Sequence, residues 1–211
     1  MHDFTQLHQA VLTGNAPGAA AAARLALDAG VDPVDLVNHA IGPAMDEVGR
    51  LYEAGEYFVP ELLLAARATK EVFQLIRPLL SQKDIQPVAR VVIGTVQGDL
   101  HDIGKNLVGA MLEGSGFEVI DLGVNVSPDK FVSAVETKQA RIVGLSALLT
   151  TTMPAMKTTL EVFRTAGIRD RVKVMIGGAP ITQSYADSIG ADAYGENAAA
   201  AVDIARKLAA G

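Results

Sequence analysis

Five short apolar runs, rich in β-branched residues, recur in the second half of the chain, and each is followed by a segment long enough for a helix. The runs at 91–93, 142–145 and 174–176 are almost continuously apolar, as strands covered on both faces are. Strands that alternate with helices pair in parallel, with helices on both faces of the sheet. The expected strands cover residues 89–94, 118–122, 141–146, 173–177 and, as a weak last run, 193–194. The pattern therefore predicts a five-stranded parallel sheet.

The first part of the chain follows a different period. From residue 4 to about residue 82 the apolar residues recur at helical spacing, with breaks at 14–17, 30–33 and 53–56, which predicts four or five helices. Asp32 is expected to cap one helix ahead of Pro33, and Pro60 to open another. A polar, proline-ended stretch at 81–87 separates the two patterns. We therefore expect an all-α helical bundle domain at 1–84 and an α/β domain at 88–211.

The charge balance excludes several classes of partner. With a net charge of −6 and a pI near 5.2, the chain offers no basic field for nucleic acid or for an anionic membrane. No uncharged apolar run reaches the roughly 20 residues that span a bilayer, and the first residues do not resemble a signal peptide. A cytoplasmic location is expected. The absence of cysteine excludes disulfides, thiolate metal sites and thiol nucleophiles.

Five strands of this kind suit a doubly wound, flavodoxin-like (Rossmann-like) order, in which ligands bind beyond the carboxyl ends of the strands. After the first expected strand, the glycine-bounded segment 98–104 places Asp99 two residues before His101. An aspartate that accepts the Nδ1 proton of an imidazole leaves Nε2 free, and more basic, to bind a metal or take a proton. A histidine beside an aspartate can equally form only a local hydrogen bond, so this pair alone does not define a site.

Two other strand ends open on the same edge. The hydroxyl-rich segment 146–152 follows the third strand, and Gly177-Gly178 follows the fourth. The hydroxyls could bond a ligand or the back of Asp99. The glycines let the backbone approach a flat or bulky group, although they also suit an ordinary strand-to-helix turn. Because residues 98–104 match neither the dinucleotide nor the P-loop glycine pattern, a nucleotide site is disfavoured.

Taken together, Asp99-x-His101-x-x-Gly104, Ser146-x-Leu148 and Gly177-Gly178 resemble the three-part signature of cobalamin-binding domains. Residues 98–106 are most similar to the subfamily found in cobalamin-dependent methionine synthase and in the corrinoid proteins of methyltransferase systems. In that family the lower base of the cofactor leaves the cobalt for a deep pocket, and a protein histidine replaces it. The resemblance implies that the cofactor is cobalamin or a related corrinoid, with cobalt as its metal.

The resemblance also implies a role for each matched residue. His101 would be the lower axial ligand of cobalt, Asp99 its hydrogen-bond partner, and Thr152 a hydroxyl behind Asp99 in a proton relay. The family often has serine in place of Thr152. The residues expected to contact the cofactor in the α/β domain are Gly98, Asp99, His101, Asp102, Ile103, Gly104, Ser146, Leu148, Thr150, Gly177, Gly178, Ala179 and Tyr194.

Residues 51–62 resemble the helical module that covers the upper, methyl-bearing face of the corrinoid in this family. By position, Tyr52 and Val59 correspond to its apolar cap residues, although side chains of this kind at helical spacing also serve as plain bundle core. The cap would have to move aside for each transfer, which makes residues 81–87 the expected hinge.

The resemblance implies a methyl carrier that is not a complete enzyme. Cobalt would alternate between Co(I) and methyl-Co(III), and His101 would bind and release it in each turnover. A substrate-specific methyltransferase would supply the methyl group, and a second methyltransferase would pass it to a thiol or tetrahydrofolate-type acceptor. A reductive activating protein would restore oxidised cobalt. The main alternative is a cobalamin-dependent sensor or regulatory protein, and a mutase subunit or a flavodoxin-like scaffold without corrinoid are further rivals.

Overall fold

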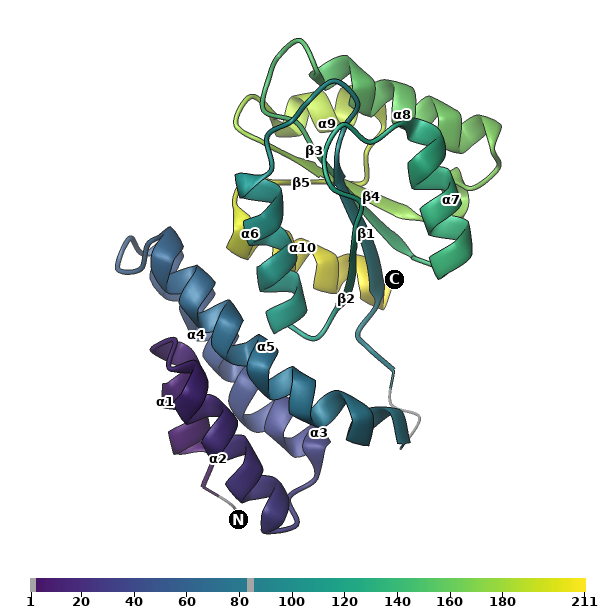
Figure 1. Cartoon of the computed structure of the whole chain (residues 1–211). Coiled ribbons are helices and arrows are strands. Elements are labelled where there is room, and N and C mark those ends of the chain that lie inside the picture. Colours follow the sequence, from purple (N-terminus) through teal and green to yellow (C-terminus); the bar gives the residue numbers. More distant parts are fainter. Residues whose placement is uncertain (1–2, 83–85) are drawn as a thin grey trace. The chain divides into compact units, whose positions relative to one another are not determined.

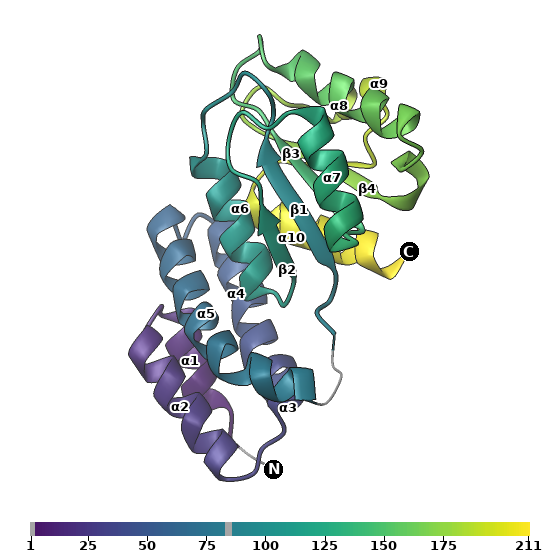
Figure 2. The same ribbon diagram turned by 45° about the vertical axis from the view of Figure 1, so that its right-hand side comes forward.

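A computed structural model describes residues 3–82 and 86–211, which form two compact units (Figure 1, Figure 2). The main division lies between Pro87 and Val88, and residues 113–116 group with the first unit. The expected hinge at 81–87 includes residues 83–85, which lie outside the described residues. None of the helices in the described ranges is both long and apolar enough to cross a membrane.

The first unit is a helical bundle, as predicted. Its elements are α1 (Thr5–Leu12), α2 (Ala16–Asp28), α3 (Pro33–Leu36), a π-helical turn (Val37–Ile41), α4 (Gly42–Glu53) and α5 (Val59–Gln82). Its breaks lie close to the expected positions. The cap at Asp32 forms as expected, because Oδ1 of Asp32 accepts the N–H of Val34 at 2.9 Å. At the start of α5, Oε2 of Glu61 accepts the N–H of Phe58 at 2.9 Å.

The π-helical turn has a cause in the sequence. Pro43 has no N–H, and in a regular α-helix its ring would collide with the carbonyl group of His39. The backbone widens just before this point, where the N–H of Gly42 donates to the carbonyl oxygen of Val37, five residues back. The chain thus runs from α3 into α4 without a break.

The core of the first unit lies where α5 packs against α2. Ala19 and Ala23 of α2 are fully buried, as are Leu62, Val72 and Ile76 of α5. Small side chains on one helix let the larger side chains of its neighbour pack between the helix axes. The alanine-rich sequence of α2 therefore suits its place beside the longest helix of the unit.

The described part of the second unit contains a five-stranded sheet. Its strands are β1 (Arg90–Thr95), β2 (Glu118–Asp121), β3 (Ile142–Ser146), β4 (Lys173–Gly177) and β5 (Ala193–Gly195). They lie in the order β2-β1-β3-β4-β5, and every neighbouring pair is parallel. The predicted doubly wound, flavodoxin-like order is confirmed.

Helices cover both faces of this sheet, with α7, α8 and α9 on one face and α6 and α10 on the other (Figure 1). Their bounds are α6 (Ile103–Gly114), α7 (Pro128–Lys138), α8 (Met153–Thr165), α9 (Gln183–Ile189) and α10 (Ala198–Ala210). Phe131 of α7 and Met156 and Phe163 of α8 are fully buried in a core that includes Val92 and Val143 of the central strands. Burial on both faces explains why the strands are almost continuously apolar.

The direction of winding reverses between β1 and β3. From β1 the chain crosses to β2 on one side, and it then returns to place β3 on the other side of β1. In such sheets ligands bind beyond the carboxyl ends of the strands at this reversal. The segments that follow β1 and β3 therefore occupy the position that the fold offers for a ligand.

Candidate functional site

Four strand ends bring most of the expected site residues to one edge of the second unit. Residues 98–104 follow β1, residues 146–152 begin with the last residue of β3, residues 177–179 begin with the last residue of β4, and Tyr194 lies in β5. Ser146, the last residue of β3, pairs with Thr95 of β1 on one side and with Gly177 of β4 on the other. The expected residues of this unit thus share the carboxyl edge of the sheet.

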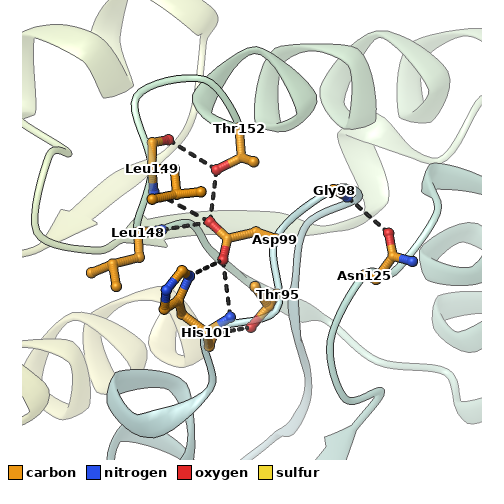
Figure 3. Close-up of polar contacts among 8 residues, drawn as sticks. All are labelled: Thr95, Gly98, Asp99, His101, Asn125, Leu148, Leu149 and Thr152. Atoms are coloured by element: carbon orange, nitrogen blue, oxygen red, sulfur yellow. Dashed lines mark hydrogen bonds and ion pairs between the residues drawn. The ribbon is translucent and has the colours of Figure 1, made fainter.

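The carboxylate of Asp99 joins the loops after β1 and β3. It is fully buried. Its Oδ1 accepts the backbone N–H of His101 at 3.0 Å and lies 2.8 Å from Nδ1 of the His101 ring. Its Oδ2 accepts from the N–H of Leu148 at 2.8 Å, the N–H of Leu149 at 3.3 Å and the hydroxyl of Thr152 at 2.7 Å (Figure 3). Among the described residues, five donors therefore meet at one carboxylate.

These contacts keep Asp99 charged. Burial disfavours the ionised form, but the hydrogen bonds from Thr152, from the N–H groups of His101 and Leu148, and from the His101 ring outweigh that cost. Together they hold the pKa of Asp99 well below its ordinary value. An ionised carboxylate can only accept hydrogen bonds, so the proton shared with the histidine ring belongs to Nδ1.

His101 is fixed through its backbone while its ring stays accessible. Its N–H donates to Asp99, and its carbonyl oxygen accepts the hydroxyl of the buried Thr95 at 2.9 Å. The side chain is 50% exposed. Within the part of the chain that the structure describes, Nε2 makes no hydrogen bond. Because Nδ1 carries the proton, the lone pair of Nε2 is available to a ligand.

Thr152 lies at the start of α8 and is almost fully buried. Besides its 2.7 Å contact with Asp99, its hydroxyl oxygen lies 2.9 Å from the carbonyl oxygen of Leu149. A threonine at this position thus reaches the carboxylate as the expected relay requires. The structure brings together all three residues of that relay, His101, Asp99 and Thr152.

Gly177 and Gly178 let the ends of neighbouring strands approach closely. A Cβ on Gly178, whose φ is 135°, would overlap the carbonyl oxygen of Ala147. A Cβ on Gly177 would lie 3.0 Å from the carbonyl oxygen of Gly195. Backbone packing therefore requires glycine at 178 and leaves little room for a side chain at 177, so this part of the edge carries no side chains.

Apolar side chains are exposed in the loops beside His101. The exposed fraction is 81% for Ile103, 70% for Leu100 and 42% for both Leu148 and Leu149. Exposed apolar groups gathered in this way mark surfaces that bind a ligand or a partner. The other expected residues of the edge are exposed or half-buried: Asp102, Gly104, Ser146, Thr150, Ala179 and Tyr194.

Two family models match the chain, and both describe a B12 binding domain. One matches residues 89–203 and the other residues 4–77. The trimethylamine corrinoid protein 2 of Methanosarcina mazei is 45% identical over 186 residues, which cover 87% of this chain and 85% of that protein. The chain belongs to the B12-binding corrinoid proteins of methyltransferase systems. Its cofactor is a corrinoid of the cobalamin type.

Solved structures share the fold of this corrinoid protein. A cobalamin-binding protein from Desulfitobacterium hafniense matches with a TM-score of 0.84 and 32% identity, over 99% of both chains. A chain of the methanol:cobalamin methyltransferase complex from Methanosarcina barkeri matches with a TM-score of 0.86 and 32% identity. That match covers 98% of this corrinoid protein and 79% of the other chain. Both units thus have counterparts among proteins of this family.

Sequence reasoning missed several residues of the site. Besides Thr95 and Leu149, it missed Asn125, which follows β2. Oδ1 of Asn125 accepts the N–H of Gly98 at 2.8 Å, and the N–H of Asn125 donates to the carbonyl oxygen of Asp99 at 2.9 Å. The signal that could have found Asn125 is topological, because the segment after β2 ends at the same carboxyl edge as the others.

A buried lysine beside the site was also missed. The side chain of Lys105, in the first turn of α6, is only 1% exposed. Its Nζ donates to Oδ2 of Asp121 at 2.5 Å and to Oδ1 of Asn106 at 2.6 Å. A cation is disfavoured at the start of a helix and in the interior, so these acceptors compensate its charge. The contact joins the start of α6 to the end of β2.

The two residues expected to cover the cofactor lie in the first unit of the corrinoid protein. Tyr52 of α4 is half-buried, and Val59, the first residue of α5, is 37% exposed. The neighbouring Phe58 is 63% exposed. The place of Tyr52 and Val59 over the corrinoid stays a prediction.

Proposed function

We propose that the corrinoid protein binds its cofactor with the lower base displaced, and that Nε2 of His101 is the lower axial ligand of cobalt. In this state it carries a methyl group between two methyltransferases. The observation that carries the proposal is the 2.8 Å contact between Asp99 and Nδ1 of a half-exposed histidine ring. Such a contact fixes the tautomer and the direction of a metal-binding imidazole.

The chemistry of the donor set fits this cofactor. The ionised Asp99 holds the proton on Nδ1, so Nε2 is the neutral nitrogen that a metal requires. The carboxylate, 2.8 Å from Nδ1, also fixes the direction in which the ring points. Thr152 donates to the far oxygen of that carboxylate and completes the relay.

The open edge of the sheet fits the remainder of the cofactor. We propose that Ser146, Leu148 and Thr150 line the space for the displaced base and its tail, beside Gly177-Gly178, Ala179 and Tyr194. The strand ends leave no room for a side chain at Gly178 and little at Gly177, so a large group would meet backbone on this side. The exposed Leu100 and Ile103 offer apolar surface to the macrocycle, beside Gly98, Asp102 and Gly104 of the same loop.

The proposed partners are those of a methyl carrier. Bound cobalt supplies a centre that can accept a methyl group and give it up again. Two relatives carry trimethylamine and methanol in their names, which supports a first methyltransferase specific for a small methylated donor. The second methyltransferase, with a thiol or tetrahydrofolate-type acceptor, and a reductive activating protein complete the proposal. The cytoplasm is the proposed location.

The histidine ligand is tested by replacing it. Full-length wild-type protein and His101→Ala, both labelled with nitrogen-15 histidine, are mixed with hydroxocobalamin, gel-filtered and reduced to Co(II). The two proteins are then compared by visible absorption and by electron paramagnetic resonance. Wild-type protein should retain corrinoid with the two-line splitting of one nitrogen-15 imidazole, whereas the cofactor's own nitrogen-14 base would give three lines. His101→Ala should lose that signal while keeping bound corrinoid, since the edge of the sheet is unchanged.

The matched control is His39→Ala, which removes a 60% exposed histidine of the first unit. It should give the wild-type spectrum. An unchanged nitrogen signal in His101→Ala would reject His101 as the ligand.

The carrier role is tested separately, with methylcobalamin-loaded protein and a thiol acceptor. Demethylation should require an added methyltransferase, and demethylation without one would contradict the carrier role.

A further inference from the structure

The main chain of Asp99 is held by a residue from a third loop. Asn125, between β2 and α7, accepts the N–H of Gly98 through Oδ1 at 2.8 Å and donates its own N–H to the carbonyl oxygen of Asp99 at 2.9 Å. Figure 3 shows Asn125 and Thr152 on different sides of the Asp99 loop. The loop after β3 therefore holds the carboxylate of Asp99, whereas Asn125 holds the backbone.

The contact between Asn125 and Gly98 holds the backbone immediately before Asp99. Gly98 has a φ of 87°, and glycine adopts many other conformations at little cost. Two hydrogen bonds fix this conformation: the N–H of Asp99 donates to the carbonyl oxygen of Val96 at 3.1 Å and closes a turn around Gly98, and the N–H of Gly98 donates to Asn125. Because Asp99 follows directly, a rotation at Gly98 would turn the carboxylate away from His101 and Thr152.

Asn125 is itself firmly placed. Its φ of 51° lies in the left-handed region, which asparagine tolerates better than most residues. The loop is bonded to β1 on both sides of it: the N–H of Thr95 donates to the carbonyl oxygen of Gly123 at 3.0 Å, and the N–H of Val126 donates to the carbonyl oxygen of Thr95 at 2.9 Å. Asn125 thus presents its amide oxygen from a fixed backbone.

We propose that Asn125 is a positioning residue for the Asp99–His101 pair. It keeps Asp99 turned toward Nδ1 of His101, so that the ring holds its proton on Nδ1 and offers Nε2 whenever it is free of metal. The inference rests on the proposed role of His101 as the cobalt ligand. It adds a residue outside the three-part signature, on a loop that the signature does not include.

Two variants separate the amide oxygen from the backbone conformation. Asn125→Gly removes the acceptor for Gly98 but keeps the N–H that donates to Asp99, and glycine relieves the positive φ. Asn125→Asp keeps an acceptor oxygen at the same place and tolerates the same φ. Gln139→Gly is the control, because Gln139 has a φ of 52° at the end of α7, away from the carboxyl edge.

The primary measurement uses the full chain without cofactor. Nitrogen-15 NMR of the histidine rings above pH 8 reports which ring nitrogen carries the proton, and amide exchange reports the bond at Gly98. Wild-type, Asn125→Asp and Gln139→Gly should show Nδ1–H at His101. Asn125→Gly should show a mixture of tautomers and roughly 2- to 10-fold faster exchange of the Gly98 amide, as expected for one lost hydrogen bond.

The same proteins are then loaded with hydroxocobalamin and reduced. The fraction of cobalt with imidazole coordination should fall in Asn125→Gly and return in Asn125→Asp. If Asn125→Gly keeps the Nδ1–H tautomer and full coordination, Asn125 only stabilises its loop and the inference fails. If wild-type protein never shows imidazole coordination while the tautomer result holds, the proposed ligand fails and the positioning of His101 stands. Asn125→Ala removes the same acceptor should Asn125→Gly be too unstable to study.

Discussion

The hydroxyl group of Thr152 meets the buried carboxylate of Asp99 over 2.7 Å, although 53 residues separate the two in sequence. The same hydroxyl oxygen lies 2.9 Å from the carbonyl oxygen of Leu149, so one proton faces two acceptors. While Asp99 is ionised, the hydroxyl can donate to it. If Oδ2 of Asp99 is protonated, it can donate to the hydroxyl oxygen of Thr152. The hydroxyl then donates to the carbonyl oxygen of Leu149 instead. Thr152 therefore suits either protonation state of Asp99.

Replacing Thr152 with valine should weaken this arrangement, because it removes the hydroxyl while keeping the shape of the side chain. We expect the free energy of unfolding to fall by about 1–3 kcal/mol, the usual range for a lost hydrogen bond to a charged group. Thr152→Ser should retain most of the stability. Chemical denaturation at pH 7 measures the stability of both variants.

The control for position 152 is Thr165→Val, which removes an exposed hydroxyl bonded to the carbonyl oxygen of Glu161 at 2.7 Å. Equal losses at positions 152 and 165 would mean that the contact with Asp99 adds nothing.

Asp99→Asn should change how stability depends on pH. The pKa of Asp99 is held low in the folded protein. The contribution of its ionised carboxylate to the free energy of unfolding is therefore fully present above pH about 5. That contribution is lost as the pH falls below about 4, toward the folded-state pKa. At pH 7 the variant should be less stable by about 2–3 kcal/mol, because an amide cannot accept from all the donors that face it.

The difference between wild-type protein and Asp99→Asn should therefore shrink as the pH falls from 5 to 3. Urea unfolding at a series of pH values measures it. Asp203→Asn, on an exposed side chain of α10 that lies 3.8 Å from Arg206, is the control and should cost less than 1 kcal/mol. A difference that stays constant across this range would show that the charge of Asp99 is not the stabilising feature.

The fold was largely predictable because strands that are buried on both faces of a parallel sheet consist almost entirely of apolar residues. The weak run at 193–194 corresponds to β5, a strand of three half-buried residues, where the same signal is necessarily faint. Asp99, His101 and Thr152 could be proposed because their side chains carry the chemistry. Asn125 and Thr95 act on backbone groups of the loop, and which groups they reach depends on strand register. In the sequence, Lys105 has the position of an ordinary polar residue of an amphipathic helix. Its burial against Asp121 depends on the tertiary structure.

The pair Lys105–Asp121 should contribute more than a surface ion pair. Lys105 is buried to 1% side-chain exposure, whereas Asp121 is 45% exposed, so solvent screens the contact in part. A double-mutant cycle with Lys105→Met and Asp121→Asn should give a coupling energy of about 1–2 kcal/mol. Asp121→Asn alone should destabilise the protein, because it leaves a buried ammonium group with less compensation.

An ion pair between β1 and β2 offers the comparison. Arg90 and Glu118 meet over 2.9 Å, with side chains that are 37% and 43% exposed. The cycle with Arg90→Met and Glu118→Gln should give no more than about 0.5 kcal/mol, as exposed pairs do. Similar coupling energies for the two pairs would contradict the importance assigned to the burial of Lys105.

Gly178→Ala should be far more harmful than an ordinary glycine substitution. The new Cβ would overlap the carbonyl oxygen of Ala147, so the ends of β3 and β4 would have to separate or the backbone at 178 would have to change. We expect a loss of at least about 3 kcal/mol, measured by thermal unfolding. Gly167→Ala is the control, since Gly167 also has a positive φ, 70°, but its Cβ would meet open space. It should cost only about 1–2 kcal/mol for the strained backbone. Equal costs at the two positions would show that the strand ends relax easily, and that this part of the edge could have carried side chains.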